Sequence, residues 1–259
     1  MCYLGIAVAL LLTGWGWADT ETGQLTQSTD EFAQANELYL AGDYQAAAQI
    51  YETMLAGGAH SAVVYYNLGN AYAQNGDLGA GMLNYRRALL LAPRDRDIIH
   101  NLANLESQVA RQPSSWEAES WMRMVLVWLL SRLTINELAA ITMSFYWLAV
   151  AMAIWRIRSR RRLVSVLLIA SLLVFCISAG LSYAKWQRDY AGGQAIVLSD
   201  AEMYSGPGQH FEPLARLGAG TEVKLVQTQG RYIEIQTGAG GHGWVSGEQA
   251  RLIFPFAQD

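Results

Sequence analysis

The sequence predicts a multi-module membrane protein, with an α-helical solenoid, two transmembrane helices and a small all-β barrel. Three observations predict this architecture. A Gly-Asp pair recurs after 34 residues in the first half of the chain, two long uncharged stretches occupy the middle, and short runs with a period of two follow near the C-terminus. Of the 259 residues, 52% are apolar and only 15% are charged. Soluble domains carry about a quarter charged residues, so part of this chain is expected in a lipid bilayer.

Two segments are predicted to span the membrane, over residues 134–155 and 163–184. They contain uncharged stretches of 18 and 22 residues. At 1.5 Å per residue the longer stretch covers about 33 Å, which matches a hydrocarbon core of about 30 Å. Trp155 and Trp186 stand near their ends as interfacial anchors. Glu137, at the outer end of the first span, is expected in the solvated interface; the alternative is a buried functional carboxylate.

An arginine-rich loop over residues 156–162 joins the two predicted spans. Short loops rich in Arg and Lys stay in the cytoplasm, so we expect this loop there and both flanking modules on the outer side. The arginines that determine this topology are Arg156, Arg158, Arg160, Arg161 and Arg162.

The N-terminal residues 1–18 have the features of a secretory signal peptide. An apolar stretch ends at Leu12, and Gly16 and Ala18 place small residues at −3 and −1 of a cleavage site. No Lys or Arg precedes the apolar stretch, which is unusual for a signal. The alternative is a buried N-terminal helix.

A shorter apolar segment over residues 120–133 precedes the first span. It contains Arg123 and Arg132 and only twelve residues between Trp121 and Arg132, so it is predicted to lie in the outer interface as a helix. If it crossed the membrane instead, there would be three spans and the C-terminal module would change sides.

Composition excludes several classes of function. Residues 19–120 carry 13 acids and 5 bases, and residues 189–259 carry 8 acids and 4 bases, so no basic surface for nucleic acid is expected. The only cysteines are Cys2 and Cys176, and the four histidines fall in separate segments, so neither a disulfide framework nor a metal site is predicted. The chain also lacks nucleophile, phosphate-loop and calcium-loop motifs. We therefore expect no enzyme and no cofactor.

Residues 28–110 contain a repeat. Gly42-Asp43 recurs as Gly76-Asp77, and the second unit fits a helix–turn–helix pattern most closely. The positions that mark this unit are Tyr65, Leu68, Gly69 and Tyr72 in its first helix and Gly81, Tyr85, Ala88 and Pro93 in or after its second. A 34-residue period with this pattern resembles the tetratricopeptide repeat family. We expect two repeats and a closing helix.

Asparagines recur with the same period. Asn36, Asn70 and Asn104 are 34 residues apart, and Asn67 and Asn101 form a second such pair. In tetratricopeptide proteins the first set faces the concave groove. An Asn amide offers both a donor and an acceptor, so these side chains are predicted to bind the main chain of an extended peptide.

Three further residues complete the expectation for this groove. Tyr66, with Tyr39 and His100, is predicted to lie near the same surface. The alternative is that Asn is simply common at this position of the family and binds nothing.

Residues 194–259 have the pattern of a small β-barrel, in which short strands alternate with glycine clusters. Met203 begins a loop of the sequence Met-Tyr-Ser-Gly-Pro-Gly, and Gly243-Trp244-Val245 marks a closing strand. These elements resemble bacterial SH3-like domains. Two positions depart from that family, since Tyr204 replaces a usual Arg and Tyr232 a usual Trp.

The SH3-like resemblance implies a module that binds peptides or cell-wall material. Tyr204, Tyr232 and Trp244 are predicted to form its aromatic ligand face. The alternative places Trp244 and Tyr232 in the core of a barrel too small to contain much else.

The whole order of modules resembles the BatE-type proteins of bacterial Bat (aerotolerance) loci. That resemblance implies a non-catalytic scaffold of the bacterial inner membrane with both soluble modules in the periplasm. Its implied partners are membrane-anchored von Willebrand A-domain proteins and a MoxR-type AAA+ ATPase. The alternative function is a cell-wall anchor, in which the barrel binds peptidoglycan and the repeats recruit a wall enzyme.

Overall fold

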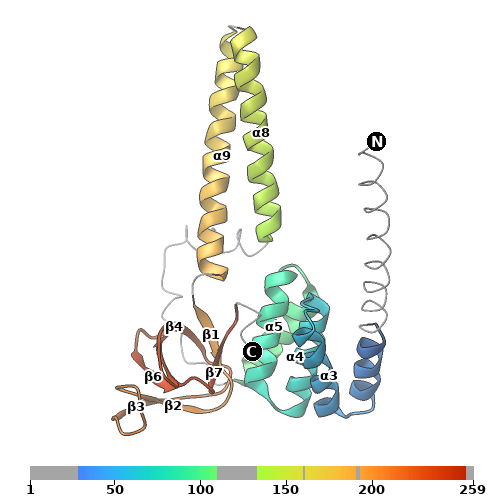
Figure 1. The fold of residues 1–259 in the computed structure, drawn as a ribbon, viewed down its shortest axis with the longest axis vertical. Coiled ribbons are helices and arrows are strands. Elements are labelled where there is room, and N and C mark those ends of the chain that lie inside the picture. The colour runs from blue at the N-terminus through green and yellow to red at the C-terminus, as the bar shows by residue number, and fades with distance from the viewer. Residues whose placement is uncertain (1–28, 110–132, 160, 191–192, 255–259) are drawn as a thin grey trace, which may run out of the picture.

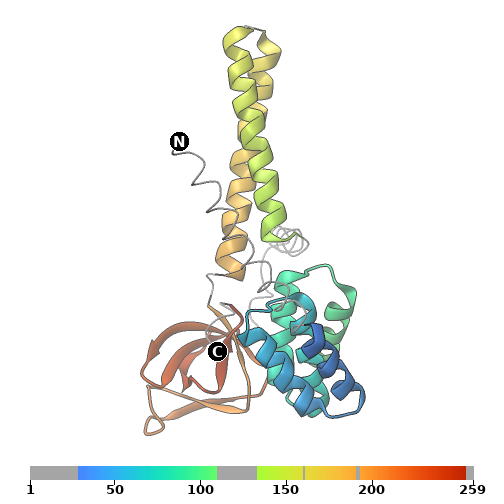
Figure 2. The same ribbon diagram turned by 45° about the vertical axis from the view of Figure 1, so that its right-hand side comes forward.

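The computed structural model describes residues 29–109, 133–159, 161–190 and 193–254. They form a helical module, a long helical hairpin and a small β module (Figure 1). The two modules lie side by side at one end of the hairpin in both ribbon views (Figure 2). The expected signal peptide, and the expected interfacial helix apart from its last residue, fall outside the described residues.

The helical module consists of antiparallel helices in chain order. It begins with a helix over residues 29–40. The helices that follow are α3 (Tyr44–Ala56), α4 (Ala62–Asn75), α5 (Leu78–Leu91) and α6 (Arg96–Gln108).

Local sequence signals set the ends of these helices. Asp43, Ser61 and Asp95 each cap a helix N-terminus by accepting hydrogen bonds from main-chain N–H groups. Gly42 and Gly76, one repeat apart, have φ of +85° and +89°. Only glycine adopts this left-handed conformation without a steric penalty, so the Gly-Asp pair ends one helix and begins the next.

Helices α4 and α5 approach closely because two glycines face each other. A Cβ atom added at Gly69 would lie 2.7 Å from the Tyr85 ring, and one added at Gly81 would lie 3.3 Å from the Gly69 carbonyl oxygen. The space is filled by Tyr85, which is 3% exposed. The predicted role of these glycines, to admit a neighbouring helix, is thus visible in the packing.

The hairpin consists of α8 (Ile135–Arg158) and α9 (Arg162–Asp189). Both helices are long and apolar enough to cross a membrane, and most of their side chains are exposed. Thr134 and Glu137 form a capping box at the start of α8. Inside the hairpin, the hydroxyl groups of Thr142 and Ser182 are 3.3 Å apart and link the two helices.

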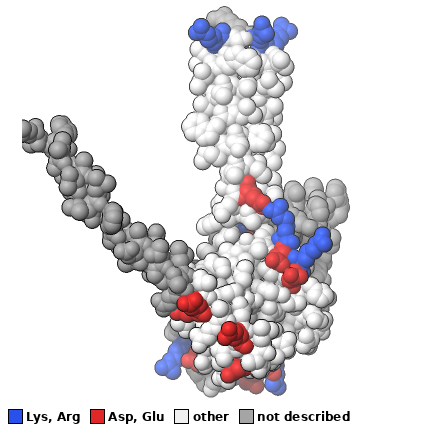
Figure 3. Space-filling model, turned by 90° about the vertical axis from the view of Figure 1, so that its right-hand side faces the viewer, with Lys and Arg blue, Asp and Glu red and all other residues white. Residues whose placement is uncertain are grey.

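The helices of the hairpin extend further than the uncharged stretches. Arg156 and Arg158 belong to the last turn of α8, and Arg162 begins α9, so the connection is confined to residues 159–161. Arginine forms helices well, and cations near a helix C-terminus interact favourably with its dipole. The arginines lie at the tip of the hairpin, at the end opposite both modules, and the shaft between is free of charge on the face shown (Figure 3).

The β module is a seven-stranded antiparallel sheet. Its strands pair in the order β3-β2-β6-β5-β4-β1-β7. Their bounds are β1 (Gln194–Val197), β2 (Ala201–Tyr204), β3 (Pro213–Leu217), β4 (Glu222–Gln229), β5 (Tyr232–Thr237), β6 (His242–Ser246) and β7 (Ala250–Leu252). Every strand contributes a buried side chain to one apolar cluster, so the sheet curls around a single core.

The two modules share a second apolar cluster. Ile196 and Ile253 of the β module pack with Met82 and Leu83 of α5 and with α6. A Cβ atom added at Gly79 would lie 2.2 Å from the Leu198 carbonyl oxygen. The absence of a side chain at this glycine therefore permits the contact between α5 and the β module.

Two adjacent arginines of α5 add polar contacts to this interface. Arg87 is 4% exposed and donates hydrogen bonds to the main-chain oxygens of Leu252 (3.1 Å) and Ile253 (3.3 Å). Arg86 forms ion pairs with Glu106 (2.8 Å) on α6 and Glu222 (2.5 Å) on β4.

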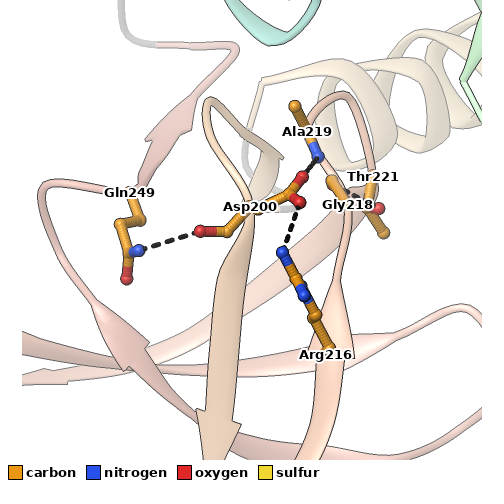
Figure 4. A network of polar contacts seen from close by, with 6 residues as sticks. All are labelled: Asp200, Arg216, Gly218, Ala219, Thr221 and Gln249. Atoms are coloured by element: carbon orange, nitrogen blue, oxygen red, sulfur yellow. Dashed lines mark hydrogen bonds and ion pairs between the residues drawn. The ribbon is translucent and has the colours of Figure 1, made fainter.

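Asp200 organises the loop that meets the helical module. Its carboxylate accepts a hydrogen bond from the main-chain N–H of Ala219 (3.1 Å) and pairs with Arg216 (2.9 Å), as Figure 4 shows. The Ala219 and Arg216 contacts hold the pKa of Asp200 below its usual range. Gly220, in the same turn, has no room for a side chain because Met82 lies against it.

Replacing Gly79 with Ala tests the contact between the modules. In an exposed helix interior, Gly→Ala stabilises by about 0.5–1 kcal/mol. Here we expect the opposite, with faster amide hydrogen exchange in α5 and β1, because the new methyl group collides with the main chain at Leu198.

The matched control is Gly180→Ala in α9, where an added Cβ meets nothing within 4 Å. Unchanged exchange in the Gly79 variant would show that the modules do not pack through this surface.

Candidate functional site

Asparagine and tyrosine side chains form a hydrogen-bonded unit that occurs twice, 34 residues apart. In the second copy, Tyr85 donates its hydroxyl hydrogen to Asn70 Oδ1 (2.6 Å), and Asn101 Nδ2 donates to the same oxygen (3.1 Å). Asn101 Nδ2 also donates to the Tyr66 hydroxyl oxygen (2.9 Å). This unit joins α4, α5 and α6.

The first copy uses the residues one repeat earlier. Tyr51 donates to Asn36 Oδ1 (2.6 Å), and Asn67 Nδ2 lies 3.5 Å from that oxygen. Phe32 stands one repeat before Tyr66, so the first copy lacks the third hydroxyl contact. This unit joins the helix over residues 29–40 to α3 and α4.

The tyrosines of these units are the buried floor of the site. Tyr51 is 1% exposed and Tyr85 is 3% exposed, while the asparagines above them are half-buried. Burial raises the pKa of Tyr51 to about 12, and burial likewise raises the pKa of Tyr85 well above its ordinary value. Both phenols therefore stay protonated as hydrogen-bond donors across the physiological range.

The second unit borders a cavity of about 450 Å³, which we call the asparagine cavity. This volume falls within the range of small-ligand pockets. Its lining residues are Tyr39, Tyr66, Asn70, Ala73, Gln74, Tyr85, Asn101, Asn104, Leu105 and Gln108. All of these side chains are uncharged, and most are polar.

The predicted groove residues fall into two groups. Tyr66, Asn70, Asn101 and Asn104 line the asparagine cavity. Asn104 is exposed, and its side chain has no hydrogen-bond partner among the described residues. Asn36 and Asn67 form the equivalent unit one repeat earlier.

Several cavity residues were not among the predicted site residues. Tyr51 and Tyr85 were identified only as packing residues, although they recur with the same 34-residue spacing as the asparagines. Gln74 and Gln108 share this spacing too and carry the signal that sequence reasoning missed. His100, expected near this surface, is exposed and does not line the cavity.

The predicted aromatic face of the β module is only partly accessible. Tyr204 and Trp244 are cross-strand neighbours on β2 and β6, but Trp244 is 8% exposed. Tyr204 and Tyr232 are half-buried. The Tyr204 hydroxyl donates to Glu202 (2.8 Å), which raises the pKa of this phenol.

A second cavity, of about 520 Å³, lies between the helical and β modules. It is bordered by α3, α4 and α5 and by Leu198 and Arg251 of the β module. Arg87 lies in its wall, with its guanidinium carbon 5.9 Å from the centre of the Tyr65 ring. Within the described ranges, no group of three or more His, Cys, Asp or Glu side chains is placed to hold a metal ion.

Comparison with known proteins gives no family assignment. No protein-family model matches the chain, and neither does any curated protein. The architecture and its asparagine cavity therefore define the candidate site by themselves.

The buried tyrosines predict a loss of stability in alkali. In the folded state Tyr51 keeps its proton up to about pH 12, whereas an unfolded chain loses it near pH 10. Between these values the unfolded state binds fewer protons, so the free energy of unfolding falls as the pH rises.

We expect the Tyr51→Phe variant to lose stability less steeply over this interval. The difference in slope is at most about 1.4 kcal/mol per pH unit. Urea unfolding followed by circular dichroism from pH 9 to 12 measures it. Equal slopes in the variant and the unaltered chain would contradict a protected phenol at this position.

Proposed function

We propose that this protein is a non-catalytic scaffold that binds a segment of a partner protein in its asparagine cavity. The observation that carries the proposal is the hydrogen-bonded Asn–Tyr–Asn unit, which occurs twice with one spacing. Side chains fixed in place before a ligand arrives lose less conformational entropy on binding, so such a unit suits recognition. In this proposal the helical module is of the tetratricopeptide type and the β module is SH3-like.

The proposal places the chain in the bacterial inner membrane through α8 and α9. Both modules adjoin the same end of the hairpin, while the arginines occupy the other end. Under the positive-inside rule this arrangement favours a cytoplasmic turn and periplasmic modules. Glu137, 38% exposed and paired with Arg94, suits an interfacial position rather than a functional carboxylate within the bilayer.

The module order supports a BatE-type role with membrane-anchored von Willebrand A-domain proteins as partners. A MoxR-type ATPase on the cytoplasmic side would meet only the short arginine turn. The alternative function, a peptidoglycan anchor, relies on the aromatic face of the β module. Because Trp244 is largely buried, that face offers only Tyr204 and Tyr232 for contact.

Asn104 is the residue with which to test partner binding. It lines the asparagine cavity and lies outside the hydrogen-bonded units, so Asn104→Ala removes a ligand contact without disturbing the fold. We expect this variant to lose most partner capture in affinity purification from gently solubilised membranes, with a tag after Asp259. Replacing Asn70 is less informative, because this residue also holds the unit together.

The matched control is Gln49→Ala, which alters an exposed side chain of α3 outside the cavity. Undiminished capture by the Asn104 variant would rule out partner binding at the cavity. Recovery of wall-synthesis or wall-cleaving enzymes, without von Willebrand A-domain proteins, would favour the anchor function.

The orientation of the hairpin is tested by cysteine labelling in intact cells. In a background without Cys2 and Cys176, Ser159→Cys should resist a membrane-impermeant thiol reagent, because this residue lies in the arginine turn. Ser205→Cys, at an exposed position of the β module, should react rapidly and serves as the control. Rapid labelling at residue 159 would mean that the proposed topology is inverted.

A further inference from the structure

We infer that the asparagine cavity takes a neutral, proline-rich segment in the polyproline II conformation, an inference that rests on the proposed function of the same cavity. Three properties of the site carry it. They are the orientation of the amide groups, the uncharged lining with its tyrosines, and the spacing of the two Asn–Tyr–Asn units.

The hydrogen bonds fix which atoms of the asparagines remain for a ligand. Asn70 Oδ1 accepts from both Tyr85 and Asn101, so its two lone pairs are used and its NH₂ group remains. Asn101 donates to Asn70 and Tyr66, so both of its N–H groups are used and its Oδ1 remains. The unit thus presents one donor beside one acceptor, which complements the C=O and N–H groups of a peptide main chain.

The preceding unit presents the same polarity. Asn36 Oδ1 accepts from Tyr51 and lies within reach of Asn67 Nδ2. The NH₂ group of Asn36 and the oxygen of Asn67 are therefore left in the same roles as their counterparts one repeat later. A ligand that crosses both units meets a donor and an acceptor twice.

The lining of the cavity selects for uncharged segments. No Lys, Arg, Asp or Glu is found among the described residues that border it. A charged ligand side chain would lose its hydration there without gaining a counter-ion. Tyr39 and Tyr66 add aromatic rings, and aromatic-lined grooves are the common receptors of proline-rich segments.

The spacing of the units discriminates between extended conformations. The bond between Asn36 and Asn67 joins the helix over residues 29–40 to α4, and the bond between Asn70 and Asn101 joins α4 to α6. Successive units are therefore separated by one helix-to-helix spacing, about 8–10 Å. A polyproline II segment returns to the same face after three residues, about 9.3 Å. A β-strand does so after about 6.7 Å and falls out of step.

The acceptor in each unit sets a further condition. Proline has no main-chain N–H, so a ligand made only of proline cannot donate to Asn101 Oδ1. The preferred ligand has a residue other than proline at every third position. Triplets of two prolines and one small neutral residue meet both requirements.

Calorimetric titration of the full chain in detergent micelles tests the inference. The probe is a twelve-residue peptide of repeated Pro-Pro-Ala triplets with acetylated and amidated ends. We expect saturable binding that is at least tenfold weaker for a twelve-proline peptide, for repeated Pro-Pro-Asp, and for repeated Thr-Ala. These three comparisons remove the N–H donor, neutrality and the three-residue period in turn.

The protein variant that isolates the donor is Asn70→Asp. It keeps an oxygen for Tyr85 and Asn101 but loses the NH₂ group, so we expect at least tenfold weaker binding of the Pro-Pro-Ala peptide. Gln49→Glu adds the same charge outside the cavity and should bind normally. Where a melting curve shows that the Asn70 variant is unfolded, the peptide series alone decides.

The outcomes separate this inference from the proposed function. A chain that captures its partner through Asn104 but does not bind the Pro-Pro-Ala peptide refutes the inference and leaves the proposed function standing. Equal binding of the Thr-Ala peptide overturns the polyproline II conformation. If capture does not depend on Asn104, both the function and the inference fail.

Discussion

The arrangement of the whole molecule depends on α5, a helix that is covered on every side. None of its residues is exposed. One side carries Tyr85 into the asparagine unit, and the other presents Met82, Leu83 and Arg87 to the β module. A helix buried all round is unusual for a surface element of a small module, because a surface helix ordinarily keeps a polar face toward water. The candidate site and the contact between the modules are thus built on opposite faces of one rigid rod.

Polar contacts make the interface between the modules specific. Apolar packing alone tolerates sliding, whereas a buried guanidinium is costly unless its N–H groups are hydrogen-bonded. Arg87 satisfies this requirement with the carbonyl oxygens of Leu252 and Ile253, and Arg86 joins α6 to β4 through two carboxylates. Any rotation of the β module against α5 would break these contacts together, which fixes one relative placement of the modules.

The sequence anticipates those features that local patterns determine. The Gly-Asp pairs indicate where helices turn, the uncharged stretches indicate the hairpin, and the alternating runs indicate strands. The capture of Asn70 by Tyr85 escapes such reasoning, because a side-chain hydrogen bond depends on how two helices are rotated against each other. The docking at Gly79 escapes it as well, since its neighbour Leu198 is distant in the chain and no periodicity links them. Burial of Trp244 depends on sheet curvature, which a period of two does not encode.

The ion pair between Arg94 and Glu137 ties the helical module to the base of the hairpin. In a chain anchored by α8 and α9, it keeps the asparagine cavity close to the bilayer surface. A partner with its own membrane anchor then diffuses in two dimensions within the same thin layer. Its effective concentration near the cavity greatly exceeds that of a freely diffusing protein, so a weak contact with a short segment is enough to keep the complex assembled. Weak contacts also dissociate quickly, which lets one scaffold exchange partners without leaving the membrane.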